Sequence, residues 1–140
     1  MDDSQEHNLG ALVTQWYKKN GRQNLPWRKS VTPYKVWISE MMLQQTQVVT
    51  AQNYYSKFLK KYPSLSSMKM ATEDDILSLW SGLGYYGRAS FIYQAKEKIF
   101  LDFNGRFPTT YDELITLPGI GRSTAGAILS IAYQKPFPIL

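Results

Sequence analysis

The chain has 140 residues and no cysteine, with 44% hydrophobic residues, 19% charged residues and a formal net charge of +5. This composition is typical of one folded domain, and it excludes disulfides and thiolate metal sites within these residues. The positive charge favours a polyanionic partner, nucleic acid ahead of an anionic membrane, although simple solubility explains the charge equally well. The single histidine, His7, cannot build a metal site by itself.

The N-terminal segment is polar and acidic and does not have the pattern of a secretory signal. No apolar run approaches the ~20 residues that are needed to cross a bilayer. We therefore expect an intracellular protein with no membrane partner, located with DNA if its positive charge serves a nucleic acid.

Apolar residues recur at helical spacing along the chain, and proline, glycine and capping residues separate the segments. No segment alternates with period two, so the sequence predicts an all-α fold with short connections. The expected helices cover residues 9–19, 34–45, 47–61, a segment that follows a Thr72–Asp75 capping box, 88–103, 110–117 and 122–133. The chain ends on the apolar string PFPIL, whereas natural termini are usually polar, so we expect a cut within a structured region.

The string LPGIGRSTAGAI, residues 117–128, places two glycines between a proline and a helix of small residues. Gly119 and Gly121 permit close approach of another backbone, and the helix that follows begins with free N–H groups. Such a helix start binds phosphate, and Arg122 and Ser123 lie at this point. A plain corner between two helices is the alternative. The complete string is similar to the helix-hairpin-helix DNA-binding motif, which we favour.

Glu40 lies in a predicted helix that carries almost no other charge. Its neighbours one turn away include Val36, Trp37 and Leu43, and apolar surroundings raise the pKa of a carboxyl group. A glutamate that is protonated near neutral pH can act as a general acid. A solvated surface glutamate is the alternative, and the sequence does not decide between the two.

Two other segments offer groups that could contact nucleobases. Gln44 and Gln45 form an amide-rich helix end, which could bind base edges or be an ordinary polar turn. In the loop LPWRKS, Trp27 offers a stacking face and Arg28 a planar set of donors. These two could line a pocket for a flat heterocycle, although a tryptophan anchored in the core explains the loop equally well.

The segment SGLGYYGR, residues 81–88, breaks the helical pattern with three glycines. A glycine-framed loop that carries Leu83 and Tyr85 suits a wedge that opens a base stack. Packing of both side chains into the core is the alternative. Arg88, at the end of this segment, could meet a phosphate.

Three strings together resemble adenine DNA glycosylases of the MutY type, in the helix-hairpin-helix or endonuclease III superfamily. They are LPWRKSVTPYKVWISEMMLQQTQV, LWSGLGYYGRA and LPGIGRSTAGAILSIAYQKPFPIL, and they occur in the family's order. The resemblance implies a base-excision-repair enzyme that flips adenine, mispaired with 8-oxoguanine or guanine, out of double-stranded DNA and removes it. It also implies that the protein acts as a monomer.

The resemblance assigns catalytic and pocket roles to residues near the start of the chain. Glu40 matches the family's catalytic glutamate, which protonates the adenine ring so that the base can leave. Trp27 and Arg28 match residues around the adenine pocket.

Other matches concern contacts with DNA. Gln45 and Tyr85, with Leu83 beside them, match residues that probe the bases near the lesion. The turn from Gly119 to Ser123 matches the hairpin that holds the DNA backbone. In the family, backbone carbonyls of this hairpin can bind a monovalent cation, and the matching carbonyls are those of Leu117 and Ile120.

One position separates the branches of the superfamily. Glycosylase/lyases place a lysine two residues after the second hairpin glycine, and its amine forms a Schiff base with the sugar. Ser123 occupies this position and cannot form such a bond, so the resemblance implies base removal without strand cleavage. An endonuclease III-like glycosylase/lyase and a non-catalytic helix-hairpin-helix DNA-binding module are the alternatives.

The family's essential aspartate, its four-cysteine 4Fe–4S site and its domain that reads 8-oxoguanine would lie beyond Leu140. We expect residues 1–30 to form an N-terminal helix and loop that pack on that iron–sulfur domain. Residues 31–140 would form the six-helix barrel, with the helix-hairpin-helix at 111–133. The chain itself would hold no cofactor, and alone it would not excise adenine at a useful rate.

Overall fold

The computed structural model describes residues 31–44 and 46–134, and no β-strand occurs among them. This confirms the all-α prediction. The helix expected at 9–19, and with it the predicted unit 1–30, lies outside the described residues. The elements are α2 (Pro33–Leu43), α3 (Val48–Lys61), the 3-10 turn η2 (Ser66–Met68), α4 (Glu73–Leu79), α5 (Gly87–Asp102), α6 (Tyr111–Leu114), α7 (Arg122–Ala127) and the π-helical segment η3 (Ile128–Ala132).

Capping residues set the starts of helices where the sequence predicts them. The Thr32 hydroxyl accepts a hydrogen bond from the Lys35 N–H at 3.2 Å, and Pro33 begins α2, where a missing N–H costs nothing. Thr72 and Asp75 form the expected capping box, with reciprocal hydrogen bonds of 3.1 and 3.0 Å. Local chemistry therefore accounts for the starts of α2 and α4.

The last predicted helix changes type part of the way along. The sequence predicts one helix over 122–133, but α7 ends at Ala127 and η3 continues with wider turns. At the end of η3 the N–H of Tyr133 bonds to the carbonyl of Ile128, five residues earlier, at 3.4 Å. Over so few residues, the spacing of apolar side chains does not distinguish an α-helix from a π-helix. The extent of the segment is therefore predicted to within one residue, whereas its helix type is predicted correctly only for 122–127.

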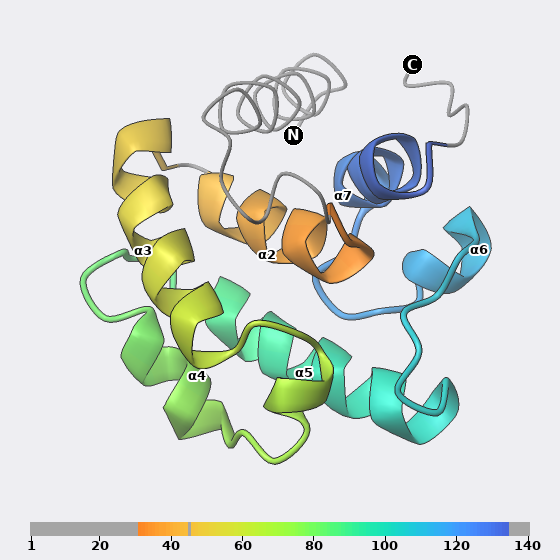
Figure 1. Ribbon diagram of the computed structural model, residues 1–140, viewed down its shortest axis with the longest axis horizontal. Coiled ribbons are helices and arrows are strands. Elements are labelled where there is room, and N and C mark those ends of the chain that lie inside the picture. The colour runs from red at the N-terminus through yellow and green to blue at the C-terminus, as the bar shows by residue number, and fades with distance from the viewer. Residues whose placement is uncertain (1–30, 45, 135–140) are drawn as a thin grey trace.

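Helix α2 is the centre of the fold (Figure 1). It packs against α3, α5, α7 and η3, and all but two of its eleven residues are buried. The core beside it includes Phe58 and Trp80, whose rings meet edge to face with centroids 6.3 Å apart. A polar side chain on α2 is consequently placed where water has little access.

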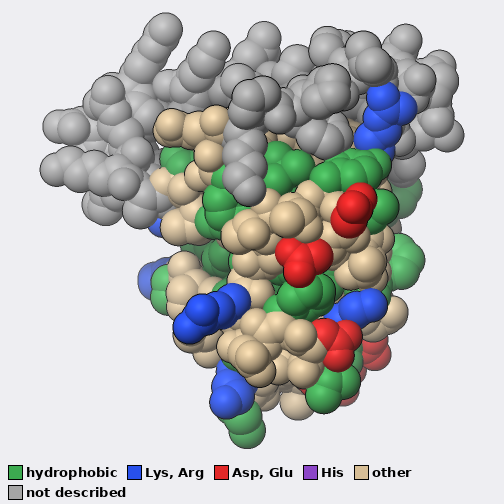
Figure 2. Space-filling model, turned by 90° about the vertical axis from the view of Figure 1, so that its right-hand side faces the viewer, with side chains coloured by type: hydrophobic (Ala, Val, Ile, Leu, Met, Phe, Trp, Pro, Cys, Tyr) green, Lys and Arg blue, Asp and Glu red, His purple; other side chains and the backbone are tan. Residues whose placement is uncertain are grey.

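The other helices surround α2. Helix α4 packs on α5 and α3, and α6 packs on α7. On the face shown in Figure 2, acidic and basic side chains are interspersed, so the net positive charge does not gather into one patch there. None of the helices in 31–44 and 46–134 combines the length and the hydrophobicity that crossing a membrane requires.

Candidate active site

The carboxyl group of Glu40 lies inside the protein, on the central helix α2. The exposed fraction of Glu40 is 0%. Its Oε1 accepts a hydrogen bond from the Ser123 hydroxyl at 3.4 Å, and its Oε2 has no hydrogen-bond partner within the described part of the chain. If Glu40 is ionised, both of its carboxylate oxygens are therefore poorly solvated.

This burial raises the pKa of Glu40 from 4.5 to about 8, because an ionised carboxylate loses its hydration there. The hydrogen bond from Ser123 acts in the opposite direction and lowers the pKa. At neutral pH the group is mostly protonated and has a proton to give. Of the two sequence-based alternatives, the solvated surface glutamate is wrong, while the role of Glu40 as an acid stays a prediction.

The buried carboxyl group should make the stability of the protein depend on pH. Since the folded-state pKa of about 8 exceeds the ordinary value of 4.5, the unfolded chain ionises first, and stability falls as pH rises from 4.5 through 8. Glu40→Gln does not ionise. We expect its free energy of unfolding, relative to wild type, to be higher at pH 9 than at pH 5 by on the order of a few kcal/mol. Urea unfolding at both pH values measures the difference, and equal values would contradict the burial of the carboxyl group.

The predicted hairpin is present as α6, a turn at 115–121 and α7. Gly119 has a φ of +80°, and a Cβ there would lie 2.6 Å from the Cβ of Phe91 and 3.2 Å from the Cε of Met41. Only glycine fits this position, because it needs both a left-handed backbone and the absence of a side chain. The N–H of Ile120 bonds to the Leu117 carbonyl at 3.1 Å, which closes the turn. The turn is thereby seated directly on α5 and α2.

The hairpin and the helix of Glu40 meet at the start of α7. Ser123, in the first turn of α7, contacts the Glu40 carboxyl group, and the neighbouring Thr124 accepts a hydrogen bond from Gln44 Nε2 at 3.5 Å. These contacts join residues that are 83 and 80 positions apart in the chain. The predicted acid and the predicted backbone-binding turn therefore belong to one site.

The glycine-framed loop 81–86 separates its two predicted wedge residues. Tyr85 has a φ of +55° and is 58% exposed, whereas Leu83 is 8% exposed and packs in the core. A positive φ is uncommon for a bulky residue, and such strain is concentrated at functional positions. The roles of Leu83 and Tyr85 in opening the base stack stay predictions. Of the two side chains, only that of Tyr85 is exposed and could contact DNA as it stands.

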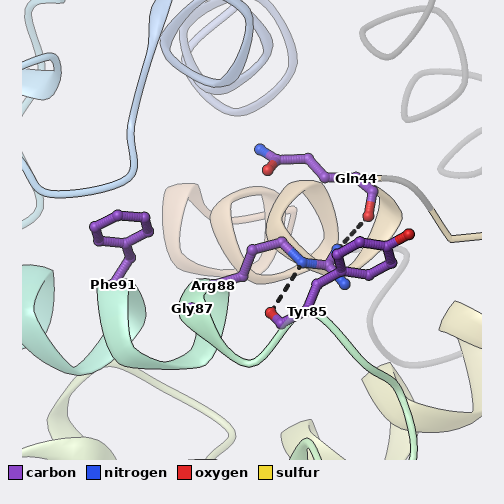
Figure 3. Close-up of a pocket in the computed structure, with 5 residues that line it drawn as sticks. All are labelled: Gln44, Tyr85, Gly87, Arg88 and Phe91. Atoms are coloured by element: carbon purple, nitrogen blue, oxygen red, sulfur yellow. Dashed lines mark hydrogen bonds between the residues drawn. The ribbon is translucent and has the colours of Figure 1, made fainter.

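A pocket of about 270 Å³ opens between the end of α2 and the start of α5 (Figure 3). Its lining consists of Gln44, Tyr85, Gly87, Arg88 and Phe91. Tyr85 and Phe91 stand at opposite ends of it, with Arg88 between them and the Gln44 amide above. Arg88 is 8% exposed, and its guanidinium donates to backbone carbonyls of the protein. Its predicted contact with a phosphate stays a prediction that this geometry does not favour.

Three predicted site residues, Trp27, Arg28 and Gln45, lie outside the described residues. The structure adds two residues to the site that the sequence did not single out. Thr124 accepts a hydrogen bond from the Gln44 amide, and Phe91 packs against Gly119. Neither belongs to a pattern with a recognisable function, because each contributes through a contact with a distant segment. No local signal could have identified them.

No metal site is built from the described residues, in which no three His, Cys, Asp or Glu side chains gather closely enough to hold an ion. The whole sequence also has no cysteine. An iron–sulfur cluster is held by cysteine thiolates, so these 140 residues do not fit one.

Curated relatives are similar to nearly the whole of this chain. A curated relative from Buchnera aphidicola (subspecies Schizaphis graminum) named adenine DNA glycosylase is 56% identical over 132 residues, which cover 94% of this chain and 38% of the relative. A human protein with the same name is 41% identical over 135 residues, covering 90% of this chain and 24% of the human protein. The chain thus spans well under half the length of these curated relatives.

Solved structures show the same fold at lower sequence identity. A thermostable thymine-DNA glycosylase superposes with a TM-score of 0.70 at 23% identity, over 94% of this chain and 61% of that one. A non-covalent endonuclease III–DNA complex gives 0.68 at 18% identity, over 96% and 61%. The model of the HhH-GPD superfamily of base excision DNA repair proteins matches residues 38–140. Because that match covers most of the sequence, the chain belongs to the HhH-GPD superfamily.

Proposed function

We propose that this chain is the helical-barrel part of an adenine DNA glycosylase, which removes adenine opposite 8-oxoguanine or guanine from double-stranded DNA. The observation that carries the proposal is the buried, protonatable Glu40 in contact with the first turn of α7. The names of the curated relatives support adenine as the base, because the sequences of these relatives match 94% and 90% of this chain. The fold alone would not select a base.

In the proposed reaction Glu40 is the general acid. When the glycosidic bond breaks, its electron pair goes to the departing adenine, and the Glu40 proton neutralises the developing negative charge. A water molecule then adds to the sugar carbon and loses a proton, which leaves an abasic site. The raised pKa of Glu40 supports this role, because the acid must hold its proton at neutral pH until the bond breaks.

The remaining residues of the site bind and open the DNA. The turn from Gly119 to Ser123, with Arg122, holds the backbone of the strand, and backbone contacts of this kind carry no base specificity. Tyr85 enters the base stack, with Gln44 and Gln45 beside the bases, while Leu83 would have to leave the core to take part.

Further details of the proposal come from the family resemblance. Trp27 and Arg28 line the adenine pocket, and the carbonyls of Leu117 and Ile120 bind a monovalent cation. The protein acts as a monomer with DNA inside the cell, and an iron–sulfur cluster, if present, uses ligands outside these 140 residues.

Ser123 favours base removal without strand cleavage, because a hydroxyl group does not form a Schiff base with the sugar. We expect the protein to release adenine but to leave no covalent adduct with DNA after borohydride treatment. Denaturing electrophoresis of the treated reaction measures this, with an endonuclease III enzyme as the positive control. A trapped adduct at the rate of base release would assign the chain to the glycosylase/lyases instead.

The function itself is tested by single-turnover assays with the full-length protein that contains this chain. Matched duplexes carry adenine opposite 8-oxoguanine, guanine or thymine. We expect rapid release of adenine from the first two and none from the third. Salt-dependent binding of all three duplexes with equal affinity and no base release would instead indicate a non-catalytic DNA-binding module.

A further inference from the structure

Arg88 joins two parts of the site that are far apart in the sequence. It is buried in the first turn of α5, where its guanidinium lies between the end of α2 and the loop 81–86 (Figure 3). Hydrogen bonds run from this one group to both of these segments. The proposed mechanism gives Arg88 no function.

On one side the guanidinium closes the end of α2. Nη1 of Arg88 donates to the carbonyls of Met41 at 2.7 Å and Met42 at 3.2 Å, and it also donates to the carbonyl of Gln44. The last carbonyls of a helix have no N–H partner within the helix. They also form the negative end of the helix dipole, so a positive charge beside them is stabilising. Glu40 precedes Met41 directly, so the Arg88 contacts hold the helical turn that carries the proposed acid.

On the other side the same guanidinium holds the loop of Tyr85. Its Nε donates to the Tyr85 carbonyl at 3.4 Å, and Nη2 donates to the Gly84 carbonyl at 3.4 Å. The ring of Tyr85 lies over the guanidinium, with its centroid 5.1 Å from Cζ. A Cβ on Gly84 would meet nothing within 4 Å, so the space beside Gly84 is open, and the hydrogen bonds from Arg88 hold its carbonyl and that of Tyr85.

We propose that Arg88 is a positioning residue that couples the loop of Tyr85 to the turn of Glu40, so that entry of Tyr85 into the base stack and alignment of the acid depend on one guanidinium. The inference rests on the proposed function. The guanidinium of Arg88 donates from three separate nitrogens in one plane, so it reaches both segments at once, whereas a lysine ammonium donates from a single atom and cannot span the two. Because these donors are already engaged with the protein, Arg88 does not bind a phosphate.

The first test is Arg88→Lys in the full-length protein, assayed at saturating protein on the adenine:8-oxoguanine duplex. We expect the single-turnover rate of adenine release to fall about a hundredfold, as loss of ~1 Å alignment does in other enzymes. Arg106→Lys replaces an exposed arginine beyond the end of α5 and is the matched control, with no expected change. An Arg88→Lys rate equal to that of wild type would overturn the inference.

The second test separates positioning from a direct DNA contact. Arg88→Gln should leave the slope of log affinity against log salt unchanged, whereas loss of a phosphate contact reduces that slope by about one. A reduced slope would show that Arg88 binds DNA and would overturn the inference. Arg106→Gln controls for the loss of one positive charge.

The third test is a double-mutant cycle, and it decides the question if Arg88→Gln does not fold. If Arg88 acts by holding Tyr85 in register with Glu40, the effects of Tyr85→Ala and Arg88→Lys on the excision rate should be less than additive. Full additivity would reduce Arg88 to a merely structural role and overturn the inference. If the wild-type protein released no adenine at all, the proposed function would fail as well, whereas an active wild type with an unaffected Arg88→Lys variant would refute only the coupling.

Discussion

Replacing Glu40 with glutamine is expected to slow adenine release by about a hundredfold to ten-thousandfold, the range that loss of a general acid produces. Glutamine has nearly the same shape and can still accept the hydrogen bond from Ser123, but it has no proton to deliver at the adenine ring. Affinity for the adenine:8-oxoguanine duplex should change little. Single-turnover excision and equilibrium binding on the same duplex measure the two quantities separately.

A second carboxyl–serine pair in the chain provides the matched control. Glu73 on α4 accepts a hydrogen bond from the Ser90 hydroxyl at 2.7 Å but is only partly buried. Glu73→Gln should leave the excision rate unchanged. Equal losses in both variants, or loss of DNA binding in Glu40→Gln, would mean that Glu40 supports the structure rather than the reaction.

The same mechanism predicts the pH profile of the wild-type enzyme. The active form carries a protonated Glu40, whose pKa is raised to about 8 by burial, so the excision rate should be level below that pH. Above it the rate should fall tenfold per pH unit as the proton is lost. A rate that rises through this range would exclude Glu40 as the acid.

The second large effect is expected at the hairpin turn, where Gly119→Ala should lower the free energy of unfolding by about 2–4 kcal/mol. An alanine backbone is strained at the φ of +80° that Gly119 adopts. The new Cβ would also lie 2.6 Å from the Cβ of Phe91. Backbone would have to move to relieve that contact, because a Cβ cannot rotate away. The hairpin would then shift relative to α2, and duplex affinity should fall as well.

Gly121→Ala is the control two residues further along the same turn. Gly121 has an ordinary φ of −98°, and a Cβ there would meet nothing within 4 Å. The change should therefore alter the free energy of unfolding by less than about 1 kcal/mol. Urea unfolding of both variants checks the prediction, and similar destabilisation by the two alanines would contradict the close contact at Gly119.

The features that depend on neighbouring residues in the chain can be predicted from the sequence. The threonine caps at Thr32 and Thr72 follow from hydrogen bonds that span three residues, and the helices begin where these caps predict. Gly119 of the hairpin follows from the left-handed backbone that such a turn needs. The serine in place of a lysine at position 123 is also visible in the sequence, and it favours one branch of the chemistry.

Which side chains water can reach depends on how distant segments pack together. The sequence of its own helix would also allow Glu40 to lie at the surface. Glu40 is buried because four other elements pack against α2. For the same reason Arg88 turns inward to carbonyls more than forty residues away, and Leu83 packs in the core while Tyr85 stays exposed. Hydrogen bonds within a turn are set by local geometry, whereas desolvation depends on atoms that distant segments contribute, and the reactivity of the candidate acid depends on desolvation.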